Sequence, residues 1–261
     1  MIFFTTSYLI ILLFTNAQST QNRGIINLQT INPNKIITAY PEHIIQIKDN
    51  KMYWKDGSIT VFDDGKQKIF DEKLANADIE DQLWQVYTKG KLQTNPTLND
   101  DAGRIRNELF FKKMYGATKS EVAKNLVTIT WLPKNVNKKI LVNKINGVDK
   151  KLQAVSDELD KLLYLKKDFK KYLENPAGTF NWRNIAGTNR LSTHSFGITI
   201  DIHVKYSNYW EWEKSNNSII YKNQIPYEIV DIFEKHGFIW GGKWYHYDTM
   251  HFEYRPELLL D

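Results

Sequence analysis

Short apolar runs alternate with turn-forming dipeptides near the start of the chain. The runs lie at residues 44–47, 52–54 and 59–62. Asp56-Gly57 separates the last two runs and Asp64-Gly65 follows them, and such dipeptides favour tight turns because they tolerate positive φ. The pattern therefore predicts a small antiparallel meander.

The apolar spacing changes in the middle of the chain. It predicts helices over residues 78–87 and 104–114, and a pair of strands over residues 126–132 and 139–145. Thr118 and Glu121 form a capping box, which indicates the start of a short helix between these two groups. This stretch should therefore combine helices with a hairpin.

A longer amphipathic helix is expected next. Apolar side chains recur at alternating four- and three-residue steps, at Val148, Leu152, Val155, Leu159 and Leu162. This is the spacing of one helix face, so residues 147–165 are predicted to pack on the preceding strand pair. Lysines crowd the opposite face, which is typical of a solvated surface, with polymer binding as the alternative.

From residue 179 onward the chain is rich in Trp and His. Residues 196–204 alternate apolar and polar side chains, which predicts a strand with one apolar and one polar face. A helix is expected to begin at Pro226 and end at Gly237. The last strand, at residues 250–254, places His251 and Glu253 on one side.

Composition and charge exclude several classes of protein. A chain of 261 residues with 42% hydrophobic and 25% charged residues is neither collagen, nor a coiled coil, nor wholly disordered. The formal net charge of +5 mildly favours anionic partners without choosing among them. Because there is no Cys, a disulfide framework, a thiolate zinc site and a cysteine nucleophile are excluded. Any metal must be held by His and carboxylate side chains.

The amino terminus carries an export pattern. An apolar run at residues 8–14 precedes Thr15-Asn16-Ala17, a small-x-small sequence suited to signal peptidase. We therefore expect a secretory signal over residues 1–17 and a secreted or periplasmic protein. The first residues lack Lys and Arg, so an uncleaved membrane anchor is the alternative. No later stretch of the sequence has the ~18 apolar residues of a membrane helix, so no stable membrane insertion is expected once the signal is removed.

Two local patterns could carry chemistry. Residues 192–201 place His194 before Gly197, which allows a sharp turn, and place Asp201 on the polar face of the following strand. His251 begins the final strand. Two imidazoles and one carboxylate are the protein ligands that a catalytic zinc keeps, with a fourth position left for water. His194, Asp201 and His251 are therefore a candidate zinc site.

Other residues near this site could assist a hydrolysis. Asp248 lies three residues before His251, close enough to exchange a proton with water without being a ligand. Arg183 and Arg190 are candidates to stabilise an oxyanion, and we favour Arg183 because residues 180–182 suggest a short rigid strand. Ser192 could hold a substrate carbonyl by a hydrogen bond.

Each of these residues also has an ordinary structural interpretation. His194 and Asp248 could be turn residues, Asp201 a charge at a strand edge, and His251 a core histidine. His203, His236 and His246 are expected to be such residues, although His246 is close enough in sequence to contact Asp248. The His-Glu-x-x-His motif of helical zinc proteases is absent from the sequence.

Together the two patterns resemble a known family. The Ser-x-His-x-x-Gly-x-x-x-Asp run from Ser192 and the Asp-x-x-His-Phe-Glu run from Asp248 are similar to those of zinc peptidases that cut peptidoglycan stem peptides. These are the D-alanyl-D-alanine carboxypeptidases and L-alanyl-D-glutamate endopeptidases. The segment 237–244, which leads into residues 248–257, also looks like the closing motif of that family.

The resemblance implies an α+β fold, with a central antiparallel sheet flanked by helices as in the hedgehog signalling domain. It implies that His194, Asp201 and His251 hold zinc and that Asp248 is the general base. By the same analogy Arg183 and Ser192 contact the substrate, although the family's Gly-Tyr-Arg-Ser sequence appears here as a looser match around Arg183. An Asp at position 248 looks more like the endopeptidase branch.

A groove beside the candidate zinc site could bind further parts of the substrate. Arg190 and Trp244 are expected to contact it, and Trp210 and Trp212 could line the groove against sugar rings and peptide. Trp240 is expected to serve core packing instead.

The expected organisation is a signal over residues 1–17, a β-rich extension over residues 18–140, and a catalytic domain over residues 141–261. The sequence predicts a secreted, monomeric zinc peptidase that acts on the peptidoglycan stem peptide and has no nucleic-acid partner. The alternative is a zinc-containing peptidoglycan-binding module without turnover. A phosphodiesterase is disfavoured because two-metal phosphate sites need more carboxylates.

Overall fold

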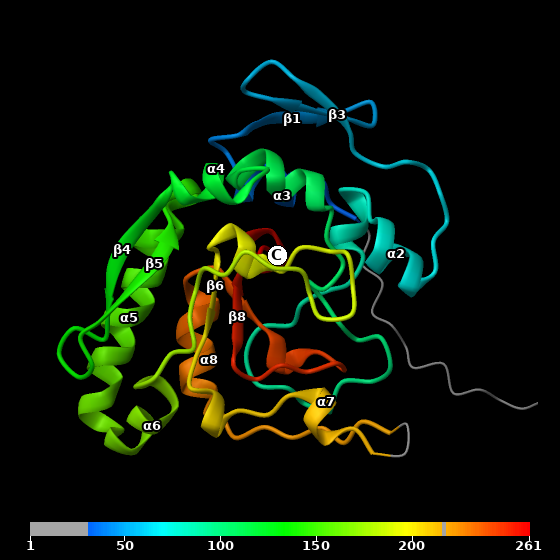
Figure 1. Cartoon of the computed structure of the whole chain (residues 1–261). Helices are drawn as coiled ribbons and strands as arrows, with labels where there is room; N and C mark the ends of the chain where they lie inside the picture. Colours follow the sequence, from blue (N-terminus) through cyan, green and yellow to red (C-terminus); the bar gives the residue numbers. More distant parts are fainter. Residues whose placement is uncertain (1–30, 216–217) are drawn as a thin grey trace, which may run out of the picture.

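The computed structural model describes residues 31–215 and 218–261. Within this part of the chain, helices combine with three small antiparallel sheets, two of which lie at the periphery, so the expected α+β class is confirmed (Figure 1). The antiparallel strands are divided among separate sheets, and the sheet that carries the candidate site has three strands in the order β6-β8-β7.

The predicted meander near the start of the chain is present. Helix α1 (Asn34–Ala39) precedes strands β1 (Ile44–Lys48), β2 (Lys51–Trp54) and β3 (Ile59–Val61), which pair in sequence order. Gly57 has a φ of 85° between β2 and β3, as the turn pattern predicted. The turn between β1 and β2 is made by Asp49 and Asn50, with φ of 52° and 58°, and such double positive φ fits the twist of a hairpin. The Asp64-Gly65 pair follows the last strand of this sheet.

The helix expected over residues 78–87 is wrong. Only a 3-10 turn, Glu80–Leu83, forms there. The side chain of Asp78 accepts a hydrogen bond from the backbone of Asp81 at 2.9 Å, and the side chain of Gln82 accepts one from the backbone of Asn107 at 3.1 Å. The polar side chains of this segment therefore bond backbone groups within the segment and at Asn107, and the segment does not continue as an α-helix.

Other helices of this region lie close to their predicted places. Helix α2 (Phe70–Asn76) was not predicted, and α3 (Glu108–Tyr115) begins later than expected because Asn107 caps it. Helix α4 (Lys119–Ala123) begins at the predicted Thr118 cap, whose hydroxyl accepts from the backbone of Glu121. The Glu121 carboxylate accepts from the backbone of Ala117, one residue before the cap, in place of the reciprocal bond to Thr118 that a capping box has.

The predicted hairpin and long helix are confirmed. Strands β4 (Leu126–Trp131) and β5 (Lys138–Asn143) pair in antiparallel register, and α5 (Val148–Leu165) packs along them (Figure 1). The buried side of α5 carries the predicted apolar positions, Leu162 excepted, since it is half-buried. Helix α6 (Lys170–Leu173) then leads toward the candidate site.

The sheet at the carboxyl end is shorter than its sequence pattern suggested. Strand β6 spans Thr199–Asp201, β7 spans Phe238–Trp240 and β8 spans His251–Tyr254. The expected strand over residues 196–204 is limited at its start by a 3-10 turn, Thr193–Phe196, and by Gly197 in a left-handed conformation. Helix α7 (Trp210–Glu213) follows β6, and α8 (Tyr227–Lys235) packs against β7.

Buried hydrophobic side chains from both ends of the chain form one cluster. It runs from Ile36 in α1 through the β4–β5 hairpin to Leu258 near the carboxyl end. The division of the chain near residue 140 stays a prediction, and β5 spans that position.

The predicted signal, residues 1–17, lies outside the described residues. Within residues 31–215 and 218–261, no helix combines the length and apolar character needed to cross a bilayer.

Candidate metal and active site

Strand pairing brings the three predicted ligands together. Asp201 is the last residue of β6 and His251 is the first residue of β8, and these two residues stand opposite each other in the antiparallel register. His194 lies on the 3-10 turn that precedes β6. Two residues that are fifty positions apart in the sequence are therefore placed side by side by one pair of strands.

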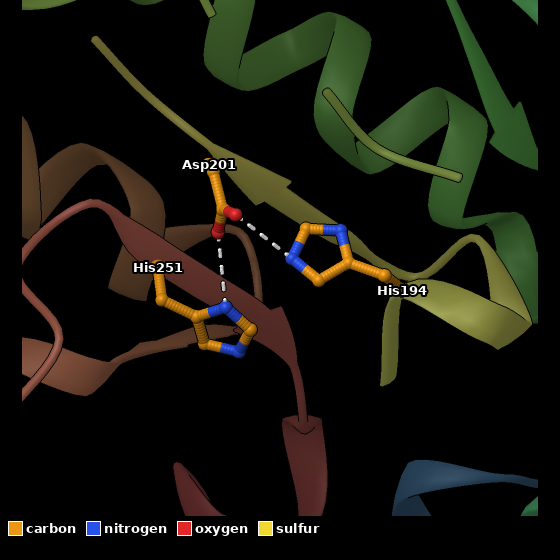
Figure 2. A group of neighbouring side chains, drawn as sticks. All are labelled: His194, Asp201 and His251. Atoms are coloured by element: carbon orange, nitrogen blue, oxygen red, sulfur yellow. Dashed lines mark hydrogen bonds and ion pairs between the residues drawn. The ribbon is translucent and has the colours of Figure 1, made fainter. Parts of the chain in front are cut away.

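The side chains converge on the Asp201 carboxylate, as Figure 2 shows. One carboxylate oxygen lies 3.0 Å from Nε2 of His194 and the other lies 3.0 Å from Nδ1 of His251. The ring centroids of the two histidines are 5.3 Å apart. One potential ligand atom from each residue lies within 4.8 Å of the others, which is compact enough for a single metal ion.

Gly197 explains why His194 can turn toward the strand that follows it. This glycine has a φ of 66°, in the left-handed region that L side chains rarely adopt. An added Cβ would lie 2.8 Å from a methyl group of Leu126 and 3.4 Å from the backbone nitrogen of Asn143. Both the conformation and the available space therefore require glycine here, as the sequence pattern predicted.

The second nitrogen of each histidine is held by another group. Nδ1 of His194 lies 3.0 Å from the carbonyl oxygen of Thr179, and Nε2 of His251 lies 3.4 Å from the Glu253 carboxylate. Groups of this kind orient metal-binding imidazoles and fix the nitrogen that faces the metal. The nitrogens left facing Asp201 are Nε2 of His194 and Nδ1 of His251.

Nε2 of His194 provides a direct test of whether a metal ion fits. It is buried and, within the described residues, has no hydrogen-bond partner, although Asp201 lies at ion-pair distance. Proximity alone does not align a donor with its acceptor, so this nitrogen remains unsatisfied. A buried nitrogen without a partner, together with a carboxylate and a second imidazole, matches the donor set of a zinc site.

The electrostatics of the cluster favour a cation. Burial acts against a charged imidazole, but hydrogen bonds to Asp201 and Glu253 outweigh it and raise the pKa of His251 to about 10. Burial also acts against the charge of Asp201, yet His194 and His251 hold the pKa of its carboxyl well below the usual range. Negative charge is therefore concentrated where a metal ion would bind.

Glu253 links the site to a buried ion network that the sequence analysis did not identify. Its carboxylate lies 3.3 Å from Arg106, and it accepts hydrogen bonds from Thr193 at 3.1 Å and from Arg255 at 3.0 Å. Glu253 and Arg255 are fully buried. The signal for Glu253 was its position two residues after His251, on the same side of the strand.

Asp248 lines the same cavity as the cluster. Its side chain is half-buried, and its buried Oδ1 has no hydrogen-bond partner within the described residues. Burial, reinforced by the charge of Asp201, raises the pKa of Asp248 to about 6. A carboxyl with this pKa can take up and release a proton near neutral pH.

A cavity of about 340 Å³ opens over these residues. Its lining includes the remaining residues expected at the site, namely Arg183, Arg190, Ser192, Trp244, Trp210 and Trp212. Arg183 is exposed, whereas Trp244 is buried with its ring centroid 5.7 Å from that of His251. The Ser192 hydroxyl accepts a long hydrogen bond of 3.4 Å from the backbone of His194.

Residues 186–254 match the family model described as D-alanyl-D-alanine carboxypeptidase. This match confirms the family resemblance and supports a metallopeptidase. It includes His194, Asp201, Asp248 and His251 but not Arg183, and it covers about a quarter of the chain. No curated protein and no solved structure was found to match.

Two further predictions, for Trp240 and His246, have clear structural outcomes. Trp240 is fully buried, as expected for a core residue. His246 does not bond Asp248. Its Nδ1 instead lies 2.7 Å from the carboxylate of Asp101, a residue of the amino-terminal half that the sequence analysis did not associate with the site.

A second group of carboxylates comes from the amino-terminal part of the chain and does not line this cavity. Asp63, Asp78 and Glu80 are half-buried and close enough together to hold an ion. Lys68 already occupies the vicinity, with its ammonium 3.1 Å from Asp78.

Proposed function

We propose that this protein is an exported zinc peptidase that hydrolyses an amide bond of the peptidoglycan stem peptide. The bond is either the L-alanyl-D-glutamate bond or the terminal D-alanyl-D-alanine bond. The observation that carries the proposal is the convergence of His194, Asp201 and His251 at the base of a cavity that also contains Asp248. The family match over the same residues supports it.

The three converging residues would hold the zinc ion. Zinc in such a site acts as a Lewis acid toward an amide carbonyl and activates water. The orientation of both imidazoles by Thr179 and Glu253 supports this role, because it leaves one nitrogen of each ring directed at Asp201.

Asp248 would move the proton in the reaction. Its carboxylate takes a proton from the attacking water as the new C–O bond forms. It then returns the proton to the amine nitrogen as the C–N bond breaks, giving a carboxylate and an amine. Burial makes this exchange favourable near neutral pH, because the pKa of Asp248 is raised to about 6.

Arg183 and Ser192 would position the substrate. Arg183 lines the cavity. Among the residues that the structure describes, its guanidinium donates one hydrogen bond, of 3.3 Å, to the carbonyl oxygen of Asn184, which leaves its other N–H groups for a substrate oxygen. Arg190, Trp210 and Trp244 would form other walls of the groove. A secreted or periplasmic location, implied by the amino-terminal pattern, would bring the enzyme to this substrate.

The proposal is tested by incubating purified zinc-loaded protein with isolated stem peptides and muropeptides. Mass spectrometry should show release of either a terminal D-alanine or the peptide beyond L-alanine, and a chelator should stop it. Asp248→Asn should keep one zinc per chain while kcat falls by about 10²–10⁴-fold, the contribution typical of a general base. Bound zinc and bound muropeptide without any cleavage would instead support a non-catalytic binding module.

A further inference from the structure

Four arginines gather around the candidate cavity. Arg183 and Arg190 belong to the loop before His194, whereas Arg104 and Arg106 come from the segment between α2 and α3. The latter two lie well outside the region matched by the peptidase family model. The amino-terminal half of the chain therefore contributes positive charge to the wall of the cavity.

These arginines differ in how far their charge is neutralised. Arg106 lies 3.3 Å from the fully buried carboxylate of Glu253, so it has a strong internal partner. Arg190 donates hydrogen bonds to the carbonyl oxygens of Leu74 at 2.7 Å and Arg104 at 3.3 Å. Within residues 31–215 and 218–261, no carboxylate lies within 4.0 Å of the Arg190 guanidinium. Backbone carbonyls orient that group without cancelling its charge.

Arg104 is held at the cavity by a single buried carboxylate. Its Nη1 lies 3.3 Å from Oδ2 of Asp101, which is a long contact, and the same oxygen is only 2.7 Å from Nδ1 of His246. Its other N–H groups have no hydrogen-bond partner among the described residues. A guanidinium has five N–H donors, so Arg104 keeps most of its capacity for a ligand.

The backbone around Arg104 is fixed in place. Gly103 has a φ of 102°, and an added Cβ would lie 2.3 Å from a side-chain carbon of Ile239 in β7. The carbonyl oxygen of Gly103 accepts a hydrogen bond of 2.8 Å from the buried Arg255. Arg104 therefore projects from a rigid support, as a preorganised binding residue requires.

Crowding these cations has an energetic cost. Burial, together with repulsion from Arg106 and Arg104, lowers the pKa of Arg190 to about 10. Like charges that face a cavity are stabilised when an anion binds between them. Arg is also the side chain best suited to bind a carboxylate through two parallel hydrogen bonds.

We propose that Arg104, supported by Asp101, forms with Arg190 a subsite for a substrate carboxylate, and that Arg104 is a specificity-determining residue of this enzyme. This inference rests on the proposed function and identifies the substrate as a stem peptide with a free carboxylate near the bond that is cut. Amidation of that carboxylate should weaken recognition, because a carboxamide carries no charge and offers one acceptor oxygen.

Two carboxylates of a stem peptide have this chemistry, namely the α-carboxylate of D-glutamate and the carboxylate of the terminal D-alanine. Four synthetic peptides distinguish them: the unmodified peptide, one amidated at D-glutamate, one amidated at the terminus, and one amidated at both positions. The amidation that lowers kcat/KM identifies the group bound in the subsite.

The decisive experiment measures kcat/KM for each peptide with the zinc-loaded wild-type enzyme and with Arg104→Gln. The wild type should prefer the relevant carboxylate by about 10- to 100-fold, the range expected for a charge-assisted hydrogen bond. Arg104→Gln should reduce that ratio to near one by slowing only the carboxylate peptide. Arg104→Lys, which keeps the charge but loses the planar fork, should give an intermediate ratio.

The comparison of substrates separates recognition from structural damage. A variant that is merely distorted would lose activity on all four peptides equally and keep their ratio. Lys119→Gln removes one charge at the exposed start of α4 and should leave every ratio unchanged. An equal ratio in the wild type and in Arg104→Gln would overturn the subsite. No cleavage of any peptide by the wild type would overturn the proposed function instead.

Discussion

The part of the chain that the structure describes contains two groups of potential metal ligands, and they differ in donor type, in burial of the donor atoms and in their neighbours. His194, Asp201 and His251 include two imidazoles, whereas Asp63, Asp78 and Glu80 are all carboxylates. The first group has an unsatisfied buried nitrogen, while the second already has Lys68 beside it. Proximity is common to both groups, so it is the donor type that makes the first group the better candidate for zinc.

The two groups also differ in what orients them. Each histidine is fixed through its second nitrogen, by the Thr179 carbonyl or the Glu253 carboxylate. In the carboxylate group, Asp63 accepts a hydrogen bond of 2.7 Å from the backbone of Gly65, which is an ordinary turn contact. A metal site needs ligands held in a set geometry before the ion arrives. In the first group this support leaves one nitrogen of each ring directed at Asp201, whereas in the second group the oxygens of Asp78 already accept hydrogen bonds from Lys68 and from the backbones of Asp64 and Asp81.

Removal of a histidine ligand should give the largest effect. His251→Ala should abolish high-affinity zinc binding and lower kcat/KM by at least about 10³-fold, because the remaining two residues cannot hold the ion in a three-ligand site. Zinc content is measured by atomic absorption after dialysis. His203→Ala is the matched control, because the His203 ring bonds the Lys171 carbonyl oxygen at 2.8 Å and packs against Tyr206, so this variant should keep its zinc. Full zinc content in His251→Ala would contradict the site.

Replacement of Glu253, the carboxylate that contacts Nε2 of His251, should have a smaller effect. Glu253→Gln should weaken zinc binding by about 10- to 100-fold, as is typical when a partner of a metal-bound imidazole is removed. It should also destabilise the fold by about 3–5 kcal/mol, because Arg106 and Arg255 lose a buried partner.

Glu257→Gln separates these two consequences. Glu257 is also fully buried and bonds Arg255 at 2.5 Å, but it bonds no histidine. Both variants should therefore lower the melting temperature, and only Glu253→Gln should weaken zinc binding in a competitive chelator titration. Equal zinc affinities in the two variants would show that Glu253 serves stability alone.

The pH dependence of activity should report Asp248. Since burial and Asp201 raise its pKa to about 6, and the ionised form is the base, kcat/KM should fall about tenfold per pH unit on the acid side. Bound zinc favours the ionised form of Asp248, so the acid limb of the kcat/KM profile should lie at or below pH 6. Zinc content is checked at each pH. Activity that stays constant or rises from pH 7 to pH 4 would exclude this role.

The sequence allowed the local part of the site to be predicted, because His194, Gly197 and Asp201 lie within one turn and strand. The other contributions depend on long-range packing. Arg104 lines the cavity because the backbone at Gly103 packs closely against Ile239. These residues are far apart in the sequence, so no local pattern predicts that contact.

The same distinction explains the fold predictions. The hairpin and helix over residues 126–165 were found because their apolar spacing is regular and their partners are neighbours in sequence. The helix expected over residues 78–87 failed because Gln82 and Gln85 direct their amides to the backbones of Asn107 and Asp101. Tertiary hydrogen bonds overrode the local pattern there.

The smallest effect is expected in the carboxylate group. Burial, and then repulsion from Asp78 and Asp81, raises the pKa of Glu80 to about 7. A carboxyl whose pKa is raised by folding destabilises the native state as the pH rises above its unfolded value near 4.5. Glu80→Gln should therefore raise the melting temperature by about 1–3 °C at pH 8, where Glu80 is ionised, and leave it unchanged at pH 4.

Zinc stoichiometry, zinc affinity and the acid limb of kcat/KM should all be unchanged in Glu80→Gln, since this group lies outside the cavity. Calorimetry at pH 4 and pH 8 measures the melting temperature, and a zinc titration measures the stoichiometry and affinity. A lower zinc stoichiometry, or a melting temperature that falls at pH 8, would mean that the carboxylates attract a cation there, and the contrast between the two groups would no longer hold.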